Sequence, residues 1–319
     1  MIAEQGDDLG EEISVIIPTK GRAESLPGVL ASLHSQSRQV YEVILVDDST
    51  EDGFQMNRRM VDDFIRSSSP SFRVEHILGR HIGLTDARNQ GFDSSRGDII
   101  SYLDDDVVLE ADYYQRLAEV MDDQEVAGVT GTITNYVPQS RRWSLFARLF
   151  FLTTAFPSGG YLRLSAYPCF TFDSPKAKDV EVMSGCNMNF RREVLVKHRF
   201  DPSLRGYSYM EDSDLSFRAS REFRLVFEPK CRLRHETADR GVDAKFYKVK
   251  MSYHRYVFRK NFSPNPLNLL AFGISVLGDL MLVTMRSIGE RDRSLVAGAL
   301  AGLSRDAMPS DHIDRNSLS

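Results

Sequence analysis

The sequence predicts an α/β protein in which a mixed, mostly parallel sheet is flanked by helices. Short apolar runs rich in β-branched residues alternate with stretches of helical periodicity through the first 121 residues. Runs with little polar alternation indicate strands buried on both faces, and strand–helix alternation indicates parallel pairing through crossover helices. In chain order, we expect strands over 13–18, 43–46, 72–78 and 99–103, and helices over 23–34, 55–66, 84–93 and 111–121.

Polar residues directly follow three of these strands, at 18–22, 47–50 and 104–106. The carboxyl ends of parallel strands share one edge of a sheet, and open α/β folds bind ligands at that edge. The sequence has neither a phosphate-binding loop with a Gly-Lys-Ser/Thr ending nor a Gly-x-Gly-x-x-Gly fingerprint. The pattern therefore indicates a nucleotide-binding fold of another type.

Three consecutive aspartates, Asp104, Asp105 and Asp106, end the apolar strand at 99–103. Carboxylates gathered at one strand end repel one another unless a hard divalent cation with oxygen ligands neutralises them. Aspartate is also a common turn residue, and one or two after a strand need have no function. Three in succession after so apolar a strand favour a metal or phosphate site.

Five segments carry further motifs: 14–19, 42–50, 83–89 leading to 102–106, 183–192 and 209–215. They resemble the motifs of family 2 glycosyltransferases, which have the GT-A fold. Each segment is weak evidence alone, but the five follow one another in the family's order and at its spacing. The resemblance implies a GT-A catalytic domain over 13–240, with a nucleotide-binding half (13–106) and an acceptor half (107–240). Outside it, composition indicates a flexible acidic tail over 1–12 and a basic and apolar helical extension over 241–319.

The resemblance assigns the acidic cluster to the metal and the donor. Asp104 and Asp106 occupy the outer positions of the family's Asp-x-Asp motif, with Asp104 directed toward ribose and metal and Asp106 toward the metal. Asp105 is either a spare carboxylate or one that assists donor binding. His235 matches a histidine that ligates the metal in many GT-A enzymes, although a lone histidine is more often structural or at the surface. The expected cofactor is a divalent cation, Mn²⁺ or Mg²⁺.

The resemblance also places the nucleotide base. Asp48 matches the acid that pairs with the edge of uracil, and Pro18 and Thr19 shape the base pocket through their backbone. Arg88 matches a basic residue near the base and diphosphate. The alternative for Arg88 is an arginine on a helix surface.

Asp212 is the expected general base, which takes the proton of the acceptor hydroxyl as that oxygen attacks the anomeric carbon. The segment 211–214 is also a plain acidic helix start, which the helix dipole favours. That alternative explains acidic residues here, but not an acid pair followed by Leu215 and Phe217 in the family's order.

The C-terminal part differs in composition. Six basic and no acidic residues lie between 245 and 260, and Asp279 is the only charged residue in 267–285. A membrane-spanning helix needs about 20 apolar residues, so 267–285 is a marginal span. Basic residues beside an apolar helix are typical of attachment to an anionic membrane surface. Alternatively, the basic strip covers the acidic catalytic domain and the apolar helix packs on its core. The apolar stretch 143–152 forms either a lip near a lipid-linked acceptor or a helix that covers the sheet.

Two classes of function fit these observations. The first is an inverting, metal-dependent enzyme that moves a sugar from a nucleotide-diphosphate donor, with UDP favoured, to a glycan or polyprenyl-phosphate-linked acceptor. The second is a non-catalytic nucleotide-sugar-binding or scaffold protein on the same fold. The joint presence of Asp104, Asp106 and Asp212 favours the enzyme. A processive synthase is disfavoured because no Gln-x-x-Arg-Trp follows Asp212.

The expected location is the cytoplasmic side of the cell membrane. Cys169, Cys186 and Cys231 are spaced neither as metal pairs nor as a disulfide framework, which favours a reducing compartment. The acidic segment 1–12 does not resemble a signal peptide. We therefore expect a role in the assembly of cell-surface polysaccharide or glycoprotein glycans at a membrane surface, with no nucleic acid as partner.

Overall fold

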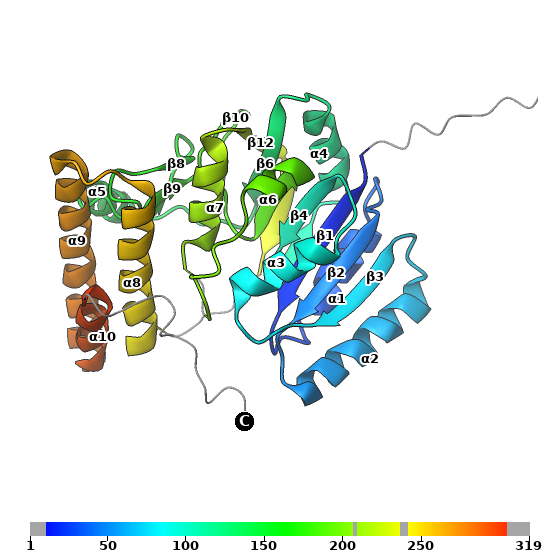
Figure 1. Cartoon of the computed structure of the whole chain (residues 1–319), viewed down its shortest axis with the longest axis horizontal. Coiled ribbons are helices and arrows are strands. Elements are labelled where there is room, and N and C mark those ends of the chain that lie inside the picture. Colours follow the sequence, from blue (N-terminus) through cyan, green and yellow to red (C-terminus); the bar gives the residue numbers. More distant parts are fainter. Residues whose placement is uncertain (1–10, 207–208, 237–241, 305–319) are drawn as a thin grey trace, which may run out of the picture.

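The computed structural model describes residues 11–206, 209–236 and 242–304, and in it a central sheet is flanked by helices (Figure 1). Most of the predicted tail over 1–12 lies outside the described residues. In the described part the central sheet contains β1 (Ile13–Thr19), β2 (Glu42–Asp47), β3 (Arg73–Leu78), β4 (Ile99–Leu103), β5 (Val107–Leu109), β6 (Val126–Ile133), β10 (Lys178–Asp179), β11 (Asn187–Arg191) and β12 (Arg224–His235).

The sheet has the strand order β10-β12-β6-β11-β4-β1-β2-β3, and β5 pairs with β12. β4, β1, β2 and β3 are all parallel neighbours, as are β6 and β12. β11 runs antiparallel between β4 and β6, which makes the sheet mixed. The predicted mixed, mostly parallel α/β fold is therefore confirmed. The four predicted strands correspond to β1, β2, β3 and β4.

Helices cover both faces of this sheet. α1, α2 and α4 contribute side chains to the apolar cluster on one face, and α3, α6 and α7 contribute to the cluster on the other. α2 begins four residues earlier than predicted, because Thr50 caps it by accepting the Gly53 N–H at 3.4 Å. The helices are α1 (Leu26–His34), α2 (Glu51–Ser68), α3 (Leu84–Ser94), α4 (Tyr113–Met121), α6 (Arg192–Lys197) and α7 (Glu211–Ser220).

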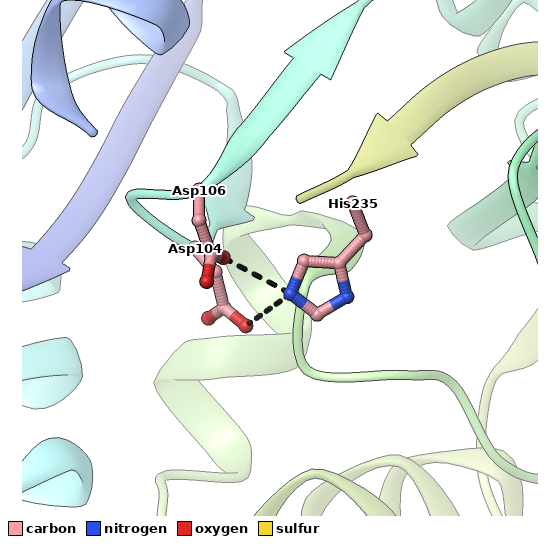
Figure 2. A group of neighbouring side chains, drawn as sticks. All are labelled: Asp104, Asp106 and His235. Carbon is pink, nitrogen blue, oxygen red and sulfur yellow. Dashed lines mark ion pairs between the residues drawn. The ribbon is translucent and has the colours of Figure 1, made fainter. Parts of the chain in front are cut away.

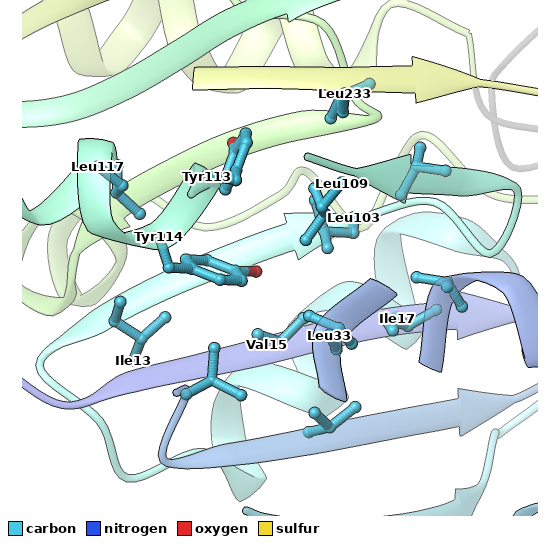
Figure 3. Close-up of a cluster of buried hydrophobic side chains, with 14 of the residues drawn as sticks. Ile13, Val15, Ile17, Leu33, Leu103, Leu109, Tyr113, Tyr114, Leu117 and Leu233 are labelled. Carbon is cyan, nitrogen blue, oxygen red and sulfur yellow. The ribbon is translucent and has the colours of Figure 1, made fainter. Parts of the chain in front are cut away.

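β1 shows why the strands lack polar alternation. Val15 and Ile17 point into the cluster under α1 and α4, whereas Ile16 points into the cluster on the opposite face. Figure 3 shows Tyr113 and Tyr114 of α4 among the side chains of the cluster that contains Val15 and Ile17. Every residue of β1 is buried, as expected for a strand covered on both sides.

A smaller sheet and a short helix follow β6 in the chain. The sheet contains β7 (Thr154–Ala155), β9 (Pro168–Phe170) and β8 (Tyr161–Leu162), in that order. The apolar stretch predicted at 143–152 belongs mainly to the helix α5 (Arg141–Leu149). α5 and the turn after it share an apolar cluster with the C-terminal helices.

Three C-terminal helices stand side by side on one flank of the molecule, at the left in Figure 1: α8 (Ala244–Asn261), α9 (Pro266–Glu290) and α10 (Ser294–Leu303). The end of α8 is bonded to α7, because Lys260 Nζ lies 2.8 Å and Asn261 Nδ2 2.9 Å from the buried carboxylate of Asp214 in α7. At least one cation of the basic strip at 245–260 is therefore paired with an acidic residue of the same chain.

α9 is the one helix in the described residues that is long and apolar enough to cross a membrane. Asp279, the only charged residue of its first 20 residues, is buried against the protein. Lys250 Nζ of α8 lies 2.5 Å from one oxygen of Asp279, and the Tyr167 hydroxyl donates to the other. The ring of His254 stacks on Tyr167 with 3.8 Å between centroids.

The Lys250–Asp279 pair gives a stability prediction. Lys250→Met leaves a buried carboxylate without its counter-charge, which costs about 3–5 kcal/mol in comparable buried pairs. We expect the free energy of unfolding in urea to fall by about that amount. The matched control is Lys248→Met, on the same helix and without an ion pair to the described residues, which we expect to cost under about 1 kcal/mol. Equal losses in both variants would contradict a specific stabilising role for the pair.

Candidate active site

The predicted site residues gather at the carboxyl edge of the parallel strands. Thr19 and Asp47 are paired at the ends of β1 and β2, and Asp104 directly follows β4. His235 is brought to this edge by the long strand β12. β12 continues past an irregularity after Glu228 and ends at His235, opposite Val107.

Asp104, Asp106 and His235 form a compact trio with one ligand atom from each residue, and these atoms lie within 4.8 Å of one another. Figure 2 shows the His235 ring directed toward both carboxylates. His235 Nε2 lies 3.0 Å from Asp106 Oδ1 and 3.8 Å from Asp104 Oδ2. The structure therefore brings together the three side chains that were predicted to hold a metal.

The trio shows strong electrostatic coupling. Burial acts to lower the pKa of His235, but its close contact with the Asp106 carboxylate and the other negative charge nearby raise it to about 11. Burial acts to raise the pKa of Asp106, but His235 and Arg22 lower it overall. The negative charge of the two carboxylates therefore favours a positive charge beside them, either a proton on His235 or a bound cation.

Asp105 is turned away from the trio. Its carboxylate accepts hydrogen bonds from Thr19 Oγ1 and Arg22 Nη1, each at 2.7 Å. Arg22 Nη1 also lies 2.7 Å from Asp106 Oδ2, so one guanidinium nitrogen bridges the two neighbouring carboxylates. Burial raises the pKa of Asp105 beyond what these contacts offset.

Asp48 is buried beside the end of β1. Its N–H donates to Thr19 O at 2.9 Å, and its Oδ1 accepts the His81 N–H at 3.0 Å. A Cβ at position 79 would lie 1.9 Å from Asp48 Oδ1, so Gly79 is what leaves room for this carboxylate. Pro18 lies one residue before the end of β1. The structure thus places Pro18, Thr19 and Asp48 at adjacent strand ends.

Arg88 is not a surface arginine, since its side chain is 1% exposed. It projects from α3 and donates to Glu211 Oε1 at 2.9 Å, to Asp104 Oδ1 at 3.1 Å and to Gly185 O at 3.0 Å. Its guanidinium also lies over the ring of Phe200. Arg88 therefore links the Asp104 end of β4 to the start of α7.

Asp212 lies in the first turn of α7, where its Oδ2 accepts the Gly185 N–H at 2.9 Å and its Oδ1 accepts the Ser213 N–H at 2.6 Å. Burial raises the pKa of Asp212, while Arg88 and these hydrogen bonds oppose the rise. Burial, together with the charge of Asp212, also raises the pKa of Glu211. A carboxylate with a raised pKa is a stronger base than an exposed aspartate.

Three residues of this site were not predicted individually. Arg22 bridges two carboxylates, Glu211 pairs with Arg88, and Gly185 supplies backbone groups to both Arg88 and Asp212. A Cβ at Gly185 would lie 3.0 Å from Arg88 Nη2, so a side chain here would crowd the arginine. Arg22 could have been found from the sequence because it belongs to the polar segment after β1.

The donor set suits a divalent cation. Two carboxylates and one imidazole are ligands that Mn²⁺ accepts, and carboxylate oxygens also suit Mg²⁺. Asp106 Oδ1 is buried and accepts no well-aligned hydrogen bond from the described residues, although His235 Nε2 lies nearby. An acceptor oxygen in that state has lone pairs free for a cation.

The chain is similar to known proteins both in sequence and in fold. Residues 14–199 match the model for glycosyl transferase family 2. A glucosyl-dolichyl phosphate glucuronosyltransferase of Haloferax volcanii is 23% identical over 293 residues, covering 85% of this chain and 84% of that protein. An undecaprenyl-phosphate 4-deoxy-4-formamido-L-arabinose transferase of Pseudomonas fluorescens is 32% identical over 138 residues. That match covers 41% of this chain and spans only 38% of the relative.

Two solved structures show the same fold at low sequence identity. The mannosyltransferase PcManGT from Pyrobaculum calidifontis, in complex with GDP-Man and Mn²⁺, superposes with a TM-score of 0.56 at 15% identity, covering 92% of this chain and 86% of that one. S. aureus TarS 1–349, in complex with UDP-GlcNAc, gives 0.56 at 15% identity, covering 93% and 82%. With the family model matching more than half of the sequence, the chain belongs to glycosyl transferase family 2 and is a glycosyltransferase of the GT-A fold.

Proposed function

We propose that this enzyme transfers a sugar from a nucleotide-diphosphate donor, with UDP favoured, to a glycan or polyprenyl-phosphate-linked acceptor, with inversion at the anomeric carbon. The observation that carries the proposal is one connected site in which Arg88 joins the Asp104 carboxylate to Glu211, and Gly185 joins Arg88 to Asp212. The carboxylate proposed to bind metal, Asp104, and the one proposed as general base, Asp212, are thus held close together although they come from different elements.

On the acceptor side, Asp212 is the general base. Inverting transfer needs a carboxylate that takes the hydroxyl proton while that oxygen attacks the anomeric carbon from the face opposite the leaving diphosphate. The hydrogen bonds from Gly185 and Ser213 fix the orientation of the Asp212 carboxylate. Its burial keeps the pKa raised, which suits proton transfer from an alcohol.

On the donor side, Asp48 recognises the base, with the backbone of Pro18 and Thr19 forming the wall of its pocket. Asp104 contacts the ribose, and Asp105 holds Arg22 beside the diphosphate. Arg88 stabilises the carboxylate frame. Asp104, Asp106 and His235 would hold the divalent cation, Mn²⁺ or Mg²⁺, which when bound offsets the charge of the leaving diphosphate as a Lewis acid.

The acceptor class rests on the relatives. Both curated relatives described above are named for transfer to dolichyl or undecaprenyl phosphate carriers or their glycosylated forms. A lipid-linked acceptor places this enzyme at a membrane surface, and we place it on the cytoplasmic side, in cell-surface polysaccharide or glycoprotein glycan assembly. A panel of nucleotide sugars assayed for hydrolysis and for thermal stabilisation with Mn²⁺ tests the proposal. The proposal would be overturned if no donor sugar were hydrolysed and none stabilised the protein against heat.

The choice of nucleotide gives a second prediction. By calorimetry with Mn²⁺ present, we expect UDP to bind more tightly than GDP or dTDP. Asp48→Asn removes a charged acceptor and should weaken UDP binding about tenfold, equivalent to ~1.4 kcal/mol. Asp63→Asn, at an exposed position of α2, is the matched control and should leave binding unchanged. Tighter binding of GDP or dTDP than of UDP would contradict the uridine assignment.

A further inference from the structure

The fully buried residues of α9 are less apolar than its exposed residues, which is the reverse of the usual arrangement for a helix of a water-soluble protein. The fully buried residues are mostly small or polar: Asn268, Ala271, Ser275, Gly278, Asp279, Val283 and Ser287. Between the two sides, Phe272, Val276, Leu280 and Leu282 are partly buried against the apolar clusters of the protein. The exposed side carries large apolar residues along its length: Leu267, Leu269, Leu270, Leu277, Met281, Met285 and Ile288. We call this exposed set the outer face of α9.

The inner side of α9 has a structural reason to be small and polar. Gly278 packs so closely against Phe150, the residue directly after α5, that a Cβ at Gly278 would lie 2.6 Å from Phe150 Cβ. Asp279 is bonded to Lys250 and Tyr167. Small residues at helix contacts and large apolar residues facing outward are the arrangement found where helices meet hydrocarbon.

The outer face carries no charge along most of its length. Asp279 is the only charged residue between Pro266 and Met285, and it points inward. The stretch from Pro266 to Met285 is roughly 30 Å long at 1.5 Å per residue, so the uncharged part of this face is extensive. Contiguous exposed apolar surface of this kind marks an interaction site.

The neighbouring helix α5 has matching features. It exposes Leu145 and Leu149, one turn apart, and contains no acidic residue. Its first turn holds Arg141 and Arg142, both exposed, which complement anionic headgroups. The only tryptophan of the chain, Trp143, lies in the same turn. Tryptophan and arginine beside an apolar surface are typical of helices at the membrane interface.

The basic strip of α8 contributes less to membrane attraction than its sequence suggests. Lys250 is paired with Asp279, and Lys260 with Asp201 and Asp214. Arg255 donates to the carbonyls of Leu303 and Ser304 at the end of α10. Contact with a membrane must therefore come mainly from apolar burial by α9, with Arg141 and Arg142 of α5 and Arg286 of α9 among the exposed cations.

We infer that the outer face of α9, flanked by α5, inserts into the apolar layer of an anionic lipid membrane. The inference deepens the proposed function, on which its biological purpose rests, because it names the surface that brings the active site to a lipid carrying the acceptor. α9 lies in the plane of the interface with its inner side held by α8 and α5. A second protein on this face is the competing occupant, but a protein partner does not account for the small and polar inner side.

The test uses the full-length protein and vesicles of phosphatidylcholine with phosphatidylglycerol. We expect the wild type to float with the vesicles and the pair Leu270→Glu/Leu277→Glu to lose at least tenfold in bound fraction. The matched control is Met56→Glu/Val196→Glu on α2 and α6, which should float like the wild type. Exposure is similar in the two pairs, at 61% and 54% for the α9 residues and 59% and 70% for the control residues.

Trp143 supplies an independent readout on the unmodified protein. We expect its fluorescence to shift to shorter wavelength on vesicle binding and to be quenched by brominated lipids. Failure of the wild type to float, or equal loss in both variant pairs, would overturn the inference. So would a dimer in light scattering that the α9 variant abolishes while vesicles bind neither protein.

Donor hydrolysis in membrane-free buffer separates this inference from the proposed function. If the α9 variant still hydrolyses a nucleotide sugar at the wild-type rate but no longer floats, both proposals stand. If the protein hydrolyses the donor but never binds vesicles, only the inference that α9 binds a membrane is contradicted. A protein that binds vesicles but neither binds nor hydrolyses any nucleotide sugar contradicts only the proposed reaction.

Discussion

Asp212→Asn is expected to lower turnover by about 10²–10⁴ while donor affinity stays within about twofold of wild type, because loss of a general base removes only the step that uses it. Asparagine keeps the size of the side chain and one accepting oxygen for the Gly185 or Ser213 N–H. The measurement is kcat with a saturating acceptor, together with donor binding by calorimetry. Asp122→Asn, at an exposed position after α4, is the control and should behave as wild type.

The pH profile of the wild type adds a second readout for the same role. Because burial raises the pKa of Asp212, the base becomes protonated at a higher pH than an exposed aspartate would. Turnover should therefore fall as the pH decreases through that raised pKa, and Asp212→Asn should flatten this acidic limb. If donor binding collapses together with turnover in the variant, Asp212 serves the nucleotide or the fold and is not the base.

Asp106→Asn is expected to lower turnover by about 10²–10³, the usual loss when one strong charge-stabilising group is removed from an active site. Asp106 is the member of the trio closest to His235, and the variant lacks a full negative charge for the cation. Thermal stabilisation by Mn²⁺ with UDP should disappear in the variant, as it should in wild type treated with EDTA. Both quantities are measured after metal removal and readdition.

Asp105→Asn is the informative comparison for Asp106, since the two residues are adjacent and both are buried. The Asp105 carboxylate contacts Thr19 and Arg22 and lies outside the trio. We expect the Asp105 variant to keep its thermal response to Mn²⁺. Near wild-type turnover of Asp106→Asn in metal-replete buffer, or equal loss of the Mn²⁺ response in both variants, would exclude a specific metal role for Asp106.

The main strands and helices of the catalytic domain could be predicted because their signals are local. The runs at 13–18 and 99–103 are apolar throughout, and both are fully buried strands in the structure. A cluster of three aspartates at a strand end is likewise visible in sequence, because the edge of a parallel sheet collects the residues that follow its strands. Strand boundaries were less predictable: β12 runs on to His235 through an irregularity that no periodicity announces.

The partners of the charged residues could not be predicted. Arg88 has the same residue type and helical position whether it faces water or the core, and only the packing of α3 against Gly185 and Glu211 buries it. Arg22 and Asp105 are 83 residues apart in sequence, yet one hydrogen bond joins them. Such pairings depend on which strands are neighbours, which is a property of the complete sheet.

The C-terminal helices show the same division most clearly. Composition alone established that 267–285 is apolar and that 245–260 is basic. It could not establish that Lys250 and Lys260 are held by acids of the same chain, or that the large side chains of α9 face outward. Sequence by itself thus determined the fold class, the strand-end chemistry and the apolar character of α9, because these depend on residue type and local spacing. Only the tertiary structure decided which charges are neutralised and which apolar surface is exposed, because both follow from contacts between distant segments.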